Sequence, residues 1–336
     1  MKHTAVRIIF VCVLGVFIAL GFREARIIGQ FSRVSLRFET PINGEAARYA
    51  RQRAIAYEGE APIWLTFWAQ ETLRLATPMR EITAPAIRFS GDAFLVWHAA
   101  YLAGSAPSGL DGYGIAVSYA LAHQLWGSLD IIGKRLYVNN APRTVRGIFE
   151  GTAPLALLPF HLEDTAPYWS AAELQLLTNC KRLTRENARQ FALSAGLGMP
   201  QNIHAGGAQA LARLMAWLPI IILIFHTAFL FMSYVKTYKP AYVMPLLLSG
   251  FIVFALVLPF LLNHLPPWLI PNQWSNFAFW ANTMQQANEG LRDFLSTVPT
   301  VRDIEIKIHL LRQTGVFIFT LCSCVLVMRP TAKTGE

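Results

Sequence analysis

The residues that could carry out chemistry in this chain do not form any of the common catalytic patterns. The sequence has no glycine-rich phosphate loop ending in Lys and Ser or Thr, so we predict that the chain does not itself hydrolyse ATP by that route. It also lacks the His-Glu-x-x-His, Cys-x-x-Cys and Gly-x-Ser-x-Gly patterns of zinc, redox and serine-hydrolase sites. We therefore predict that the protein is not an enzyme and that any associated ATPase activity belongs to a partner.

Isolated cysteines and histidines predict neither a metal site nor a disulfide framework. Cys322 and Cys324 are two residues apart on a predicted helix and do not face each other, which argues against a metal pair. Cys180 is the single cysteine outside the predicted membrane helices, so no disulfide is expected within the chain. Three histidines stand alone, as is typical of surface or hydrogen-bonded core residues: His98, His123 and His161. No catalytic residue, metal ligand or cofactor is predicted.

The composition indicates a membrane protein. Hydrophobic residues make up 54% of the 336 residues and charged residues 15%, whereas soluble domains have roughly 45–50% and about 25%. Four windows contain no charged residue, namely 8–22, 214–235, 240–262 and 313–328. About 20 residues of helix cross the hydrocarbon layer, so the middle two windows are long enough. The outer two are short, but their flanking arginines can extend toward the headgroups: Arg7, Arg23, Arg312 and Arg329.

The charges beside these windows predict how the chain is oriented. If the N-terminus is cytoplasmic, the inside segments have a net charge of +5, the positive-inside pattern. The basic residues of these segments are Lys2, Arg7, Lys236, Lys239, Arg329 and Lys333, and Glu336 is the acidic one. Residues 23–213 carry 19 Lys and Arg against 15 Asp and Glu. The overall charge of +9 therefore does not come from a basic patch of the kind that binds nucleic acid, and no nucleic-acid partner is predicted.

The predicted architecture is four transmembrane α-helices with an inserted extracytoplasmic α+β domain. Its segments are the first span at 1–22, the external domain at 23–213, two spans at 214–262, a second external segment at 263–312, and the last span with a short cytoplasmic tail at 313–336. The first window has an alternative, because basic residues precede it and Ala19, Leu20 and Gly21 would suit a signal-peptide cleavage site. Both alternatives export the following domain.

The external domain shows the pattern of strands mixed with short helices. Residues 23–57 are rich in Arg, Ala and Glu and predict a helical stalk that turns at Pro41. Apolar spacing predicts a short amphipathic helix over 115–125. Residues 134–138 and 144–149 predict a hairpin joined by Asn139, Asn140, Ala141 and Pro142. The box formed by Ser170 and Glu173 predicts the start of a helix toward Cys180.

The second external segment contains two different periodicities. Apolar residues spaced by three and four predict a helix with one apolar stripe, and we take five of them as candidate contacts to a partner or to the membrane: Phe277, Trp280, Met284, Leu291 and Phe294. Packing of this stripe within the same chain is the alternative. Farther on, Ile304, Ile306, Ile308 and Leu310 alternate with polar residues, a strand-like period of two.

A helix, a glycine loop and a hairpin together form the most recognisable pattern in the sequence. Residues 114–149 read GIAVSYALAHQLWGSLDIIGKRLYVNNAPRTVRGIF. This run resembles the periplasmic core domain of MacB/FtsX-type ABC transporter permeases, which reads as VS…LA..LFG followed by D.IGK.I.VNN..YTVVGV. The matching positions are Val117, Ser118, Leu121, Ala122, Leu125, Gly127, Asp130, Gly133, Lys134, Val138, Asn139, Val145 and Gly147.

The matching residues have a structural explanation. Gly127, Gly133 and Gly147 would form turns. Asp130 would cap its loop or accept hydrogen bonds within it. Lys134 begins the first strand of the predicted hairpin, and Asn139 begins its turn. We therefore treat these positions as a structural motif of the module and assign them no ligand.

The resemblance implies a permease-like subunit of an ABC transporter complex in a bacterial cytoplasmic membrane. Such a subunit would couple a separate cytoplasmic ATPase to the external domain. Lys236, Tyr238 and Lys239, between the second and third spans, would form the ATPase-facing loop. The implied partners are an ABC ATPase, membrane lipid and a second permease copy or homologue. This loop is shorter than in the family, which keeps an alternative open: a non-transporting, membrane-anchored interaction or assembly protein.

The predicted orientation can be tested by cysteine labelling. Because the inside segments hold the excess of positive charge, cysteines introduced at Ser128 and Asn288 should react with a membrane-impermeant thiol reagent added outside. A cysteine at Thr237 should react only after the membrane is opened. Each variant is made in a background without native cysteines, and labelling of Thr237 from outside would contradict the four-span arrangement.

Overall fold

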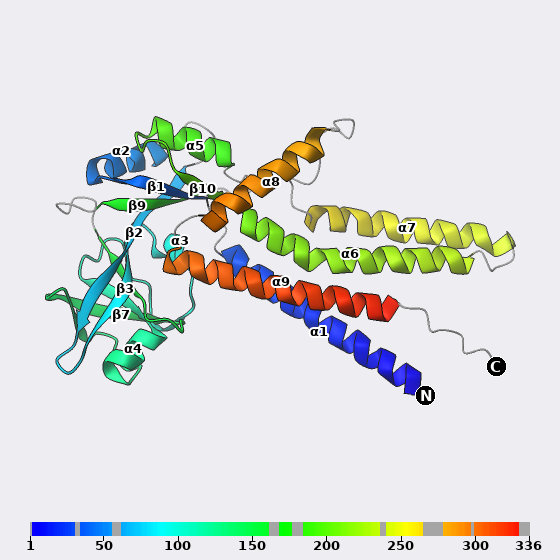
Figure 1. Cartoon of the computed structure of the whole chain (residues 1–336), viewed down its shortest axis with the longest axis horizontal. Helices are drawn as coiled ribbons and strands as arrows, with labels where there is room; N and C mark the ends of the chain where they lie inside the picture. Colours follow the sequence, from blue (N-terminus) through cyan, green and yellow to red (C-terminus); the bar gives the residue numbers. More distant parts are fainter. Residues whose placement is uncertain are drawn as a thin grey trace. The chain divides into compact units, whose positions relative to one another are not determined.

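The computed structural model describes residues 2–30, 34–55, 62–160, 168–176, 184–235, 240–264, 278–296 and 299–328. The chain divides into two compact units, which are shown with their elements in Figure 1. We call Met1–Gln30, Gly207–Glu289 and Glu305–Glu336 the helical unit, and Phe31–Gly206 with Gly290–Ile304 the sheet unit. The sheet unit thus includes residues from near the end of the chain, which the predicted domain over 23–213 did not.

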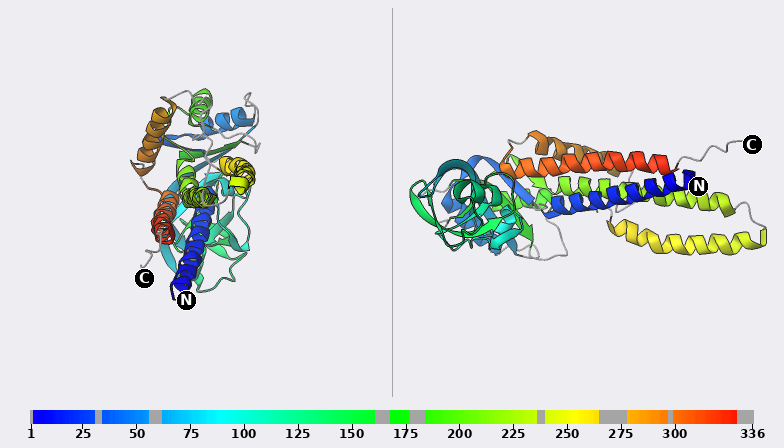
Figure 2. Two further views of the ribbon diagram at one scale, coloured as in Figure 1. Left: turned by 90° about the vertical axis from the view of Figure 1, so that its right-hand side faces the viewer. Right: turned by 90° about the horizontal axis from the view of Figure 1, so that it is seen from below.

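The helical unit is built from long helices that contain the predicted spans. The helices are α1 (Lys2–Gln30), α6 (Gly207–Val235), α7 (Pro240–His264) and most of α9 (Val301–Met328), and each contains one of the four charge-free windows (Figure 2). Within the described ranges, α6 and α9 are long and apolar enough to cross a membrane. The described apolar stretch of α7, Val243–Leu256, is shorter.

Small residues bring α1 and α6 together. Ala25 and Ile28 of α1 pack against Ala212 and Ala216 of α6 in one buried cluster. Small side chains let helix backbones approach closely, as is common between helices in membranes.

The sheet unit is organised around one ten-stranded mixed sheet. The strand order is β10-β1-β9-β2-β3-β8-β5-β7-β4, and β6 pairs with both β2 and β7. The β3–β8 and β5–β7 pairs are parallel, and the other described pairs are antiparallel. The strands are β1 (Val34–Ile42), β2 (Ile63–Ala76), β3 (Glu81–Ser90), β4 (Tyr101–Gly104), β5 (Gly114–Ser118), β6 (Arg135–Val138), β7 (Ala141–Phe149), β8 (Ala156–Pro159), β9 (Trp169–Leu176) and β10 (Asn202–Ala205).

Short helices cover this sheet over three hydrophobic clusters. The helices α2 (Gly44–Ile55) and α5 (Arg185–Ser194) lie beside β1, β9 and β10 (Figure 1). They bury alanines and Phe191 in the cluster that they share with these strands. The helix α4 (Tyr119–Trp126) covers the hairpin of β6 and β7, and the short α3 (Ala93–Val96) packs near Trp68 and Phe149. The second predicted external segment contributes the helix α8 (Ala278–Ser296), which confirms the helix expected from its apolar stripe.

The hairpin within the recognised motif is confirmed, and the preceding helix starts later than predicted. Residues 114–118 form a strand in which every residue is buried, and α4 begins only at Tyr119. The Ser118 Oγ accepts a hydrogen bond from the Leu121 N–H and so caps α4. The β6–β7 turn is shorter than predicted, because Ala141 and Pro142 belong to β7 and pair with Val138 and Tyr137. It has positive φ at Asn139 (46°) and Asn140 (71°), which suits a two-residue hairpin turn.

Of two segments predicted to be helical, one is interrupted by a strand and the other forms a strand. The helix expected over residues 23–57 continues only to Gln30 and is followed by β1 and then α2. The helix predicted from Ser170 and Glu173 is the strand β9. Both β1 and β9 are paired on both sides in the sheet, so long-range ladder hydrogen bonds outweigh the local helix signal. Glu173 points into the protein as a charged group and does not act in a helix cap.

The strand predicted from the alternation of Ile304 to Leu310 is wrong, because these residues belong to α9. A capping box starts this helix: the Thr300 Oγ1 donates to Asp303 Oδ2 at 2.7 Å, and the Asp303 N–H donates back to Thr300 Oγ1 at 3.3 Å. An alternating pattern of seven residues is too short to distinguish a strand from one face of a long helix.

Gly133 provides a test of the motif's backbone geometry. Its φ is +82°, and no neighbouring atom lies within 4 Å of where a Cβ would be, so a side chain there would be strained without being crowded. Gly133→Val should therefore destabilise the full-length protein by roughly 1–3 kcal/mol, measured by tryptophan fluorescence during unfolding in detergent. Ile132→Val, at an exposed neighbouring position, is the matched control. An unchanged unfolding midpoint for the Gly133 variant would contradict a requirement for positive φ.

Candidate functional site

The strongest concentration of buried charge in the described residues lies where α9 begins. Arg37 of β1 forms an ion pair with Asp303 of α9 at 2.8 Å, and Arg302 of α9 forms one with Glu173 of β9. Their side chains are at most 9% exposed. All four residues belong to the sheet unit, and we call them the ionic junction. It joins the first turn of a predicted membrane helix to β1 and β9, two neighbouring strands of the sheet.

Strand register places the first half of the ionic junction. Ser35 of β1 lies opposite Glu173 of β9, and the Ser35 Oγ donates to Glu173 Oε1 at 2.7 Å. Arg37 is two residues after Ser35 and therefore points to the same side of the sheet. The Trp68 Nε1 donates to the same Glu173 oxygen at 2.9 Å. One carboxylate thus receives hydrogen bonds from two strands as well as from Arg302.

Trp68 also packs against both cations of the ionic junction. The guanidinium carbon of Arg37 lies 4.4 Å from the Trp68 ring centroid, and that of Arg302 lies 5.7 Å from it. An indole face attracts a cation most strongly when both are removed from water. Trp68 is fully buried, so both contacts between a guanidinium and the ring lie in an apolar setting.

The second half of the ionic junction depends on how α9 starts. The Thr300 and Asp303 capping box fixes the first turn, and the Val301 N–H donates to Gln70 Oε1 at 2.7 Å. A helix N-terminus has unpaired N–H groups and a partial positive charge, so acceptors from β2 and from its own Asp303 are favourable there. Arg302 and Asp303 can then reach two different strands.

The charges of the ionic junction balance, but its hydrogen bonding is incomplete. Burial lowers the pKa of Arg37, while the Asp303 and Glu173 carboxylates oppose that change. The Nε atoms of Arg37 and Arg302 and the Glu173 Oε2 have no hydrogen-bond partner among the described residues. In such an incomplete network, the desolvation free energy of each polar group is less fully offset by hydrogen bonds than in a complete one. The network therefore contributes more to a specific geometry than to stability. Within the described part of the chain, no group of three or more His, Cys, Asp or Glu residues could hold a metal ion.

The preceding segment adds two further contacts to the sheet unit. Arg185 of α5 pairs with Asp293 of α8 at 2.5 Å. Phe294 is buried, and its ring meets the His204 ring of β10 edge-on at 5.5 Å. The chain from 290 to 304 is therefore held by an exposed ion pair, an aromatic contact and the ionic junction.

The predicted stripe on α8 is divided between different environments. Phe294 packs within the same chain, as in the alternative prediction. Met284 and Leu291 are exposed, with exposed fractions of 73% and 38%. Trp280 lies on α8, and Phe277 lies outside the described residues. A partner or membrane contact therefore remains a prediction for the exposed part of the stripe.

The motif residues lie elsewhere in the sheet unit and perform structural tasks. Gly127 (φ 67°) ends α4 in the left-handed conformation, and the Arg74 N–H donates to Asn139 Oδ1 at 3.2 Å. A Cβ at Gly147 would collide with the Ser105 carbonyl, so that position requires close backbone approach. Asp130 and Lys134 are exposed. The structure does not bring these residues to the ionic junction.

The predicted ATPase-facing residues Lys236, Tyr238 and Lys239 lie outside the described residues. That part of the prediction is therefore untested. The flanking helices end at Val235 and begin at Pro240.

Sequence reasoning missed the ionic junction because its members are 266 and 129 residues apart along the chain. One local signal was available, since Thr300 and Asp303 have the spacing of a capping box before an apolar run. Glu173 inside a run of apolar and small residues was a second signal, because a buried carboxylate must find a partner. Neither signal identifies that partner.

No protein-family model and no curated protein matches the sequence. Among solved structures, the chain is similar to the extracellular domain of the ABC-type transporter YknZ from Gram-positive bacteria, with 13% identity, 50% of this chain and 97% of that chain covered, and a TM-score of 0.40. It is also similar to the periplasmic region of MacB from Actinobacillus actinomycetemcomitans, with 10% identity, 48% and 83% covered, and a TM-score of 0.40. At these identities and scores the likeness assigns no residue role here.

Two features of the structure bear on the class of protein. Helices α6 and α9 are apolar enough to span a membrane, and the sheet unit is an α+β domain. The structure therefore combines an α+β domain with helices that have the length and apolarity of membrane spans.

Arg302 allows a direct test of the ionic junction. Arg302→Leu leaves the Glu173 carboxylate buried without its counter-charge and should destabilise the full-length protein by about 3–5 kcal/mol. Adding Glu173→Gln removes the unpaired buried charge but keeps an acceptor for the Trp68 N–H. The double variant should therefore regain about 1–3 kcal/mol of the free energy of unfolding that the single variant loses. Unfolding in detergent, followed by tryptophan fluorescence, provides the measurement.

Arg185→Leu is the matched control, because it removes an arginine from a pair whose side chains are 45% and 31% exposed. This variant should lose less than about 1 kcal/mol. Equal losses for Arg302→Leu and Arg185→Leu would contradict a special role for buried charge.

His204 predicts a loss of stability in acid. Burial, and then the charge of Arg37, lowers the pKa of His204 from 6.5 to about 4. Between these pH values the unfolded chain binds more protons, so stability that is present above pH 6.5 should fall as the pH approaches 4. The loss should be at most about 3 kcal/mol, and His204→Gln should remove it. His123→Gln, on the exposed surface, should leave the pH profile unchanged.

Proposed function

We propose that the chain is a permease-like subunit of an ABC transporter complex that couples a separate cytoplasmic ATPase to its own extracytoplasmic domain. In this proposal α1, α6, α7 and α9 all cross the membrane and the sheet unit lies outside. The observation that carries the proposal is the ionic junction. It fixes the first turn of a predicted membrane helix to β1 and β9 of the sheet unit.

The continuity of α9 makes such coupling physically reasonable. The helix runs without a break from Val301 to Met328, which is 28 residues and roughly 42 Å. A continuous helix resists stretching, because every turn is closed by backbone hydrogen bonds. A shift of α9 along its axis would therefore move Arg302 and Asp303, and through them β9 and β1. A loosely tethered helix would not transmit that displacement.

An external energy source follows from the sequence. The chain has no phosphate-binding loop, so ATP-driven movement would require a second protein. The predicted inside segments are short, and residues 236–239 between α6 and α7 are the candidate contact. Lys236 and Lys239 give this loop a positive charge that would suit an acidic surface on the ATPase.

A non-transporting anchor or assembly protein is the second candidate function. The observation that favours it is the separation of only four residues between Val235 and Pro240, which leaves little room for a coupling helix. In that case the sheet unit would act as a membrane-anchored interaction domain, and the ionic junction would only set its attachment to α9.

Native pull-down decides between the two functions. Tagged full-length protein is isolated from its own membranes in mild detergent, and the co-purified proteins are identified by mass spectrometry. The proposal expects a cytoplasmic protein with a phosphate-binding loop, and Lys236→Glu with Lys239→Glu should deplete it. Lys134→Glu with Arg135→Glu, on the exposed surface of the sheet unit, is the charge-matched control. Recovery of extracytoplasmic proteins alone, unaffected by the loop variant, would favour the anchor.

A further inference from the structure

Three arginines from three packed helices border the apolar part of the helical unit. Arg23 directly follows the charge-free window 8–22 in α1. Arg213 directly precedes the window 214–235 in α6, and Arg312 directly precedes the window 313–328 in α9. Each helix thus carries one arginine at the same end of its apolar segment.

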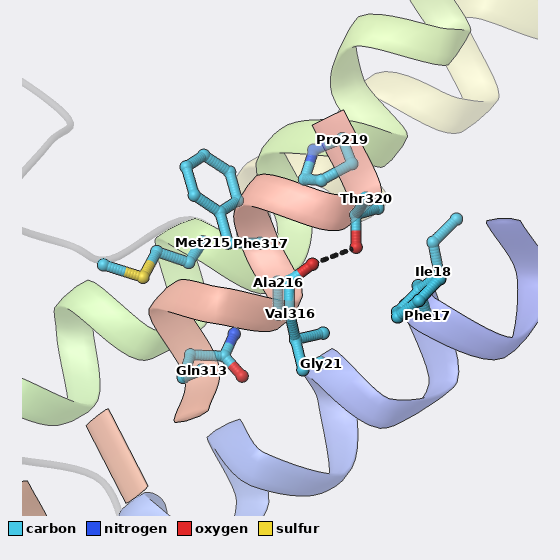
Figure 3. A pocket seen from close by; sticks show the side chains of 10 residues that line it. All are labelled: Phe17, Ile18, Gly21, Met215, Ala216, Pro219, Gln313, Val316, Phe317 and Thr320. Carbon is cyan, nitrogen blue, oxygen red and sulfur yellow. Dashed lines mark hydrogen bonds between the residues drawn. The ribbon is translucent and has the colours of Figure 1, made fainter. Parts of the chain in front are cut away.

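Contacts between the helices place these arginines at one level. The Gln313 Nε2 donates to the Ala212 carbonyl at 3.2 Å, and a Cβ at Gly21 would lie 3.8 Å from the same nitrogen. Figure 3 shows Gly21 and Gln313 beside the same small cavity, which is lined by α1, α6 and α9. Each arginine is one or two residues from one of these three residues, so all three fall within about one helical turn along the bundle.

Arg23 and Arg312 point away from the helix contacts. Both are exposed, whereas Gly21 and Gln313 on the same helices are buried between them. Among the described residues neither arginine forms an ion pair with a carboxylate. The nearest acidic residue in the sequence, Glu24, is bound to His309 at 2.7 Å.

An aromatic residue marks the same boundary. Trp217 follows Arg213 by one helical turn and lies in the apolar segment of α6. Its ring contacts the Phe22 ring edge-on, with 5.2 Å between the ring centroids. Trp is enriched where the hydrocarbon meets the headgroups, because its ring is apolar and its N–H seeks a polar partner. The arginines beside it would therefore lie at the depth of the lipid phosphates.

We propose that Arg23, Arg213 and Arg312 form a collar that binds the phosphate groups of anionic phospholipids in the outer leaflet. The proposal rests on the four-span arrangement given under the proposed function. A guanidinium offers a planar fork that matches two phosphate oxygens, and its long stem lets it reach the headgroups from the bundle. Three cations on the outer side run against the usual inside preference for positive charge, so an anionic ligand there would compensate for their placement.

Lipid titration of the purified full-length protein tests the collar. Native mass spectrometry counts bound phosphatidylglycerol and, in parallel, bound phosphatidylcholine. Replacing all three arginines by Gln should weaken phosphatidylglycerol binding roughly a hundredfold, because each basic residue near an anionic surface contributes about a fivefold gain. The triple Lys variant should retain most of the binding, since it keeps the charge.

The matched control replaces Arg48, Arg135 and Arg189 by Gln, which removes the same charge from exposed positions of the sheet unit. Wild-type affinity is expected for this control. Unchanged binding in the collar triple Gln variant, equal binding of both lipids by the wild type, or loss in the triple Lys variant equal to that in the Gln variant would each overturn the proposal.

The single Gln variants, each expected to lose about fivefold, decide the matter if the triple variant does not fold. The assay contains no ATPase, so failure to recover an ATPase partner leaves its outcome unaffected. Cysteine labelling of the same protein reports independently on the four-span arrangement.

Discussion

Two ion pairs removed from water determine how the start of α9 packs within the sheet unit. A buried carboxylate or guanidinium without its partner carries a desolvation cost of several kcal/mol, so Arg37, Glu173, Arg302 and Asp303 must satisfy one another together. That requirement constrains features far apart in the sequence. It fixes the register that places Ser35 opposite Glu173, and it fixes the residue at which α9 begins. A slip of one residue in β1 would turn Arg37 to the other side of the sheet.

The ionic junction is better suited to fixing the position of α9 against the sheet than to raising the free energy of unfolding. Replacing buried ion pairs by apolar residues is often neutral or favourable in proteins, whereas removing one partner is costly. The unfilled Nε and Oε2 atoms of the ionic junction leave it short of the best possible hydrogen bonding. A purely apolar contact between α9 and the sheet would lack the directional hydrogen bonds that fix this geometry. This property connects the ionic junction with the proposed transmission of movement.

Local sequence predicted the elements whose structure is decided locally. The hairpin at Asn139 and Asn140, the helical stripe of α8 and the helices containing the charge-free windows follow from turn chemistry and periodicity. The strands β1 and β9 could not be recognised, because their neighbours come from distant parts of the chain. For the same reason Glu173 was assigned to a helix cap, although its nearest charged partner, Arg302, lies at the far end of the sequence. A single sequence supplies the charged residue but not the pairing.

The two halves of α9 show how one helix can serve two environments. Residues 313–328 contain no charge, whereas residues 301–312 contain Arg302, Asp303, Glu305, Lys307 and Arg312. In the polar half, contacts depend on charge: His309 meets Glu24 of α1, and Arg302 and Asp303 meet the sheet. In the apolar half the same helix packs through small and aromatic groups, such as Phe319 stacked on Phe17 at 5.7 Å. Apolar packing between membrane helices resists small sliding less than a charge-matched contact does, because no unpaired charge is created when apolar groups shift. Under the proposed function, movement within the bilayer would be accommodated in the apolar half of α9 and passed to the sheet by its polar half.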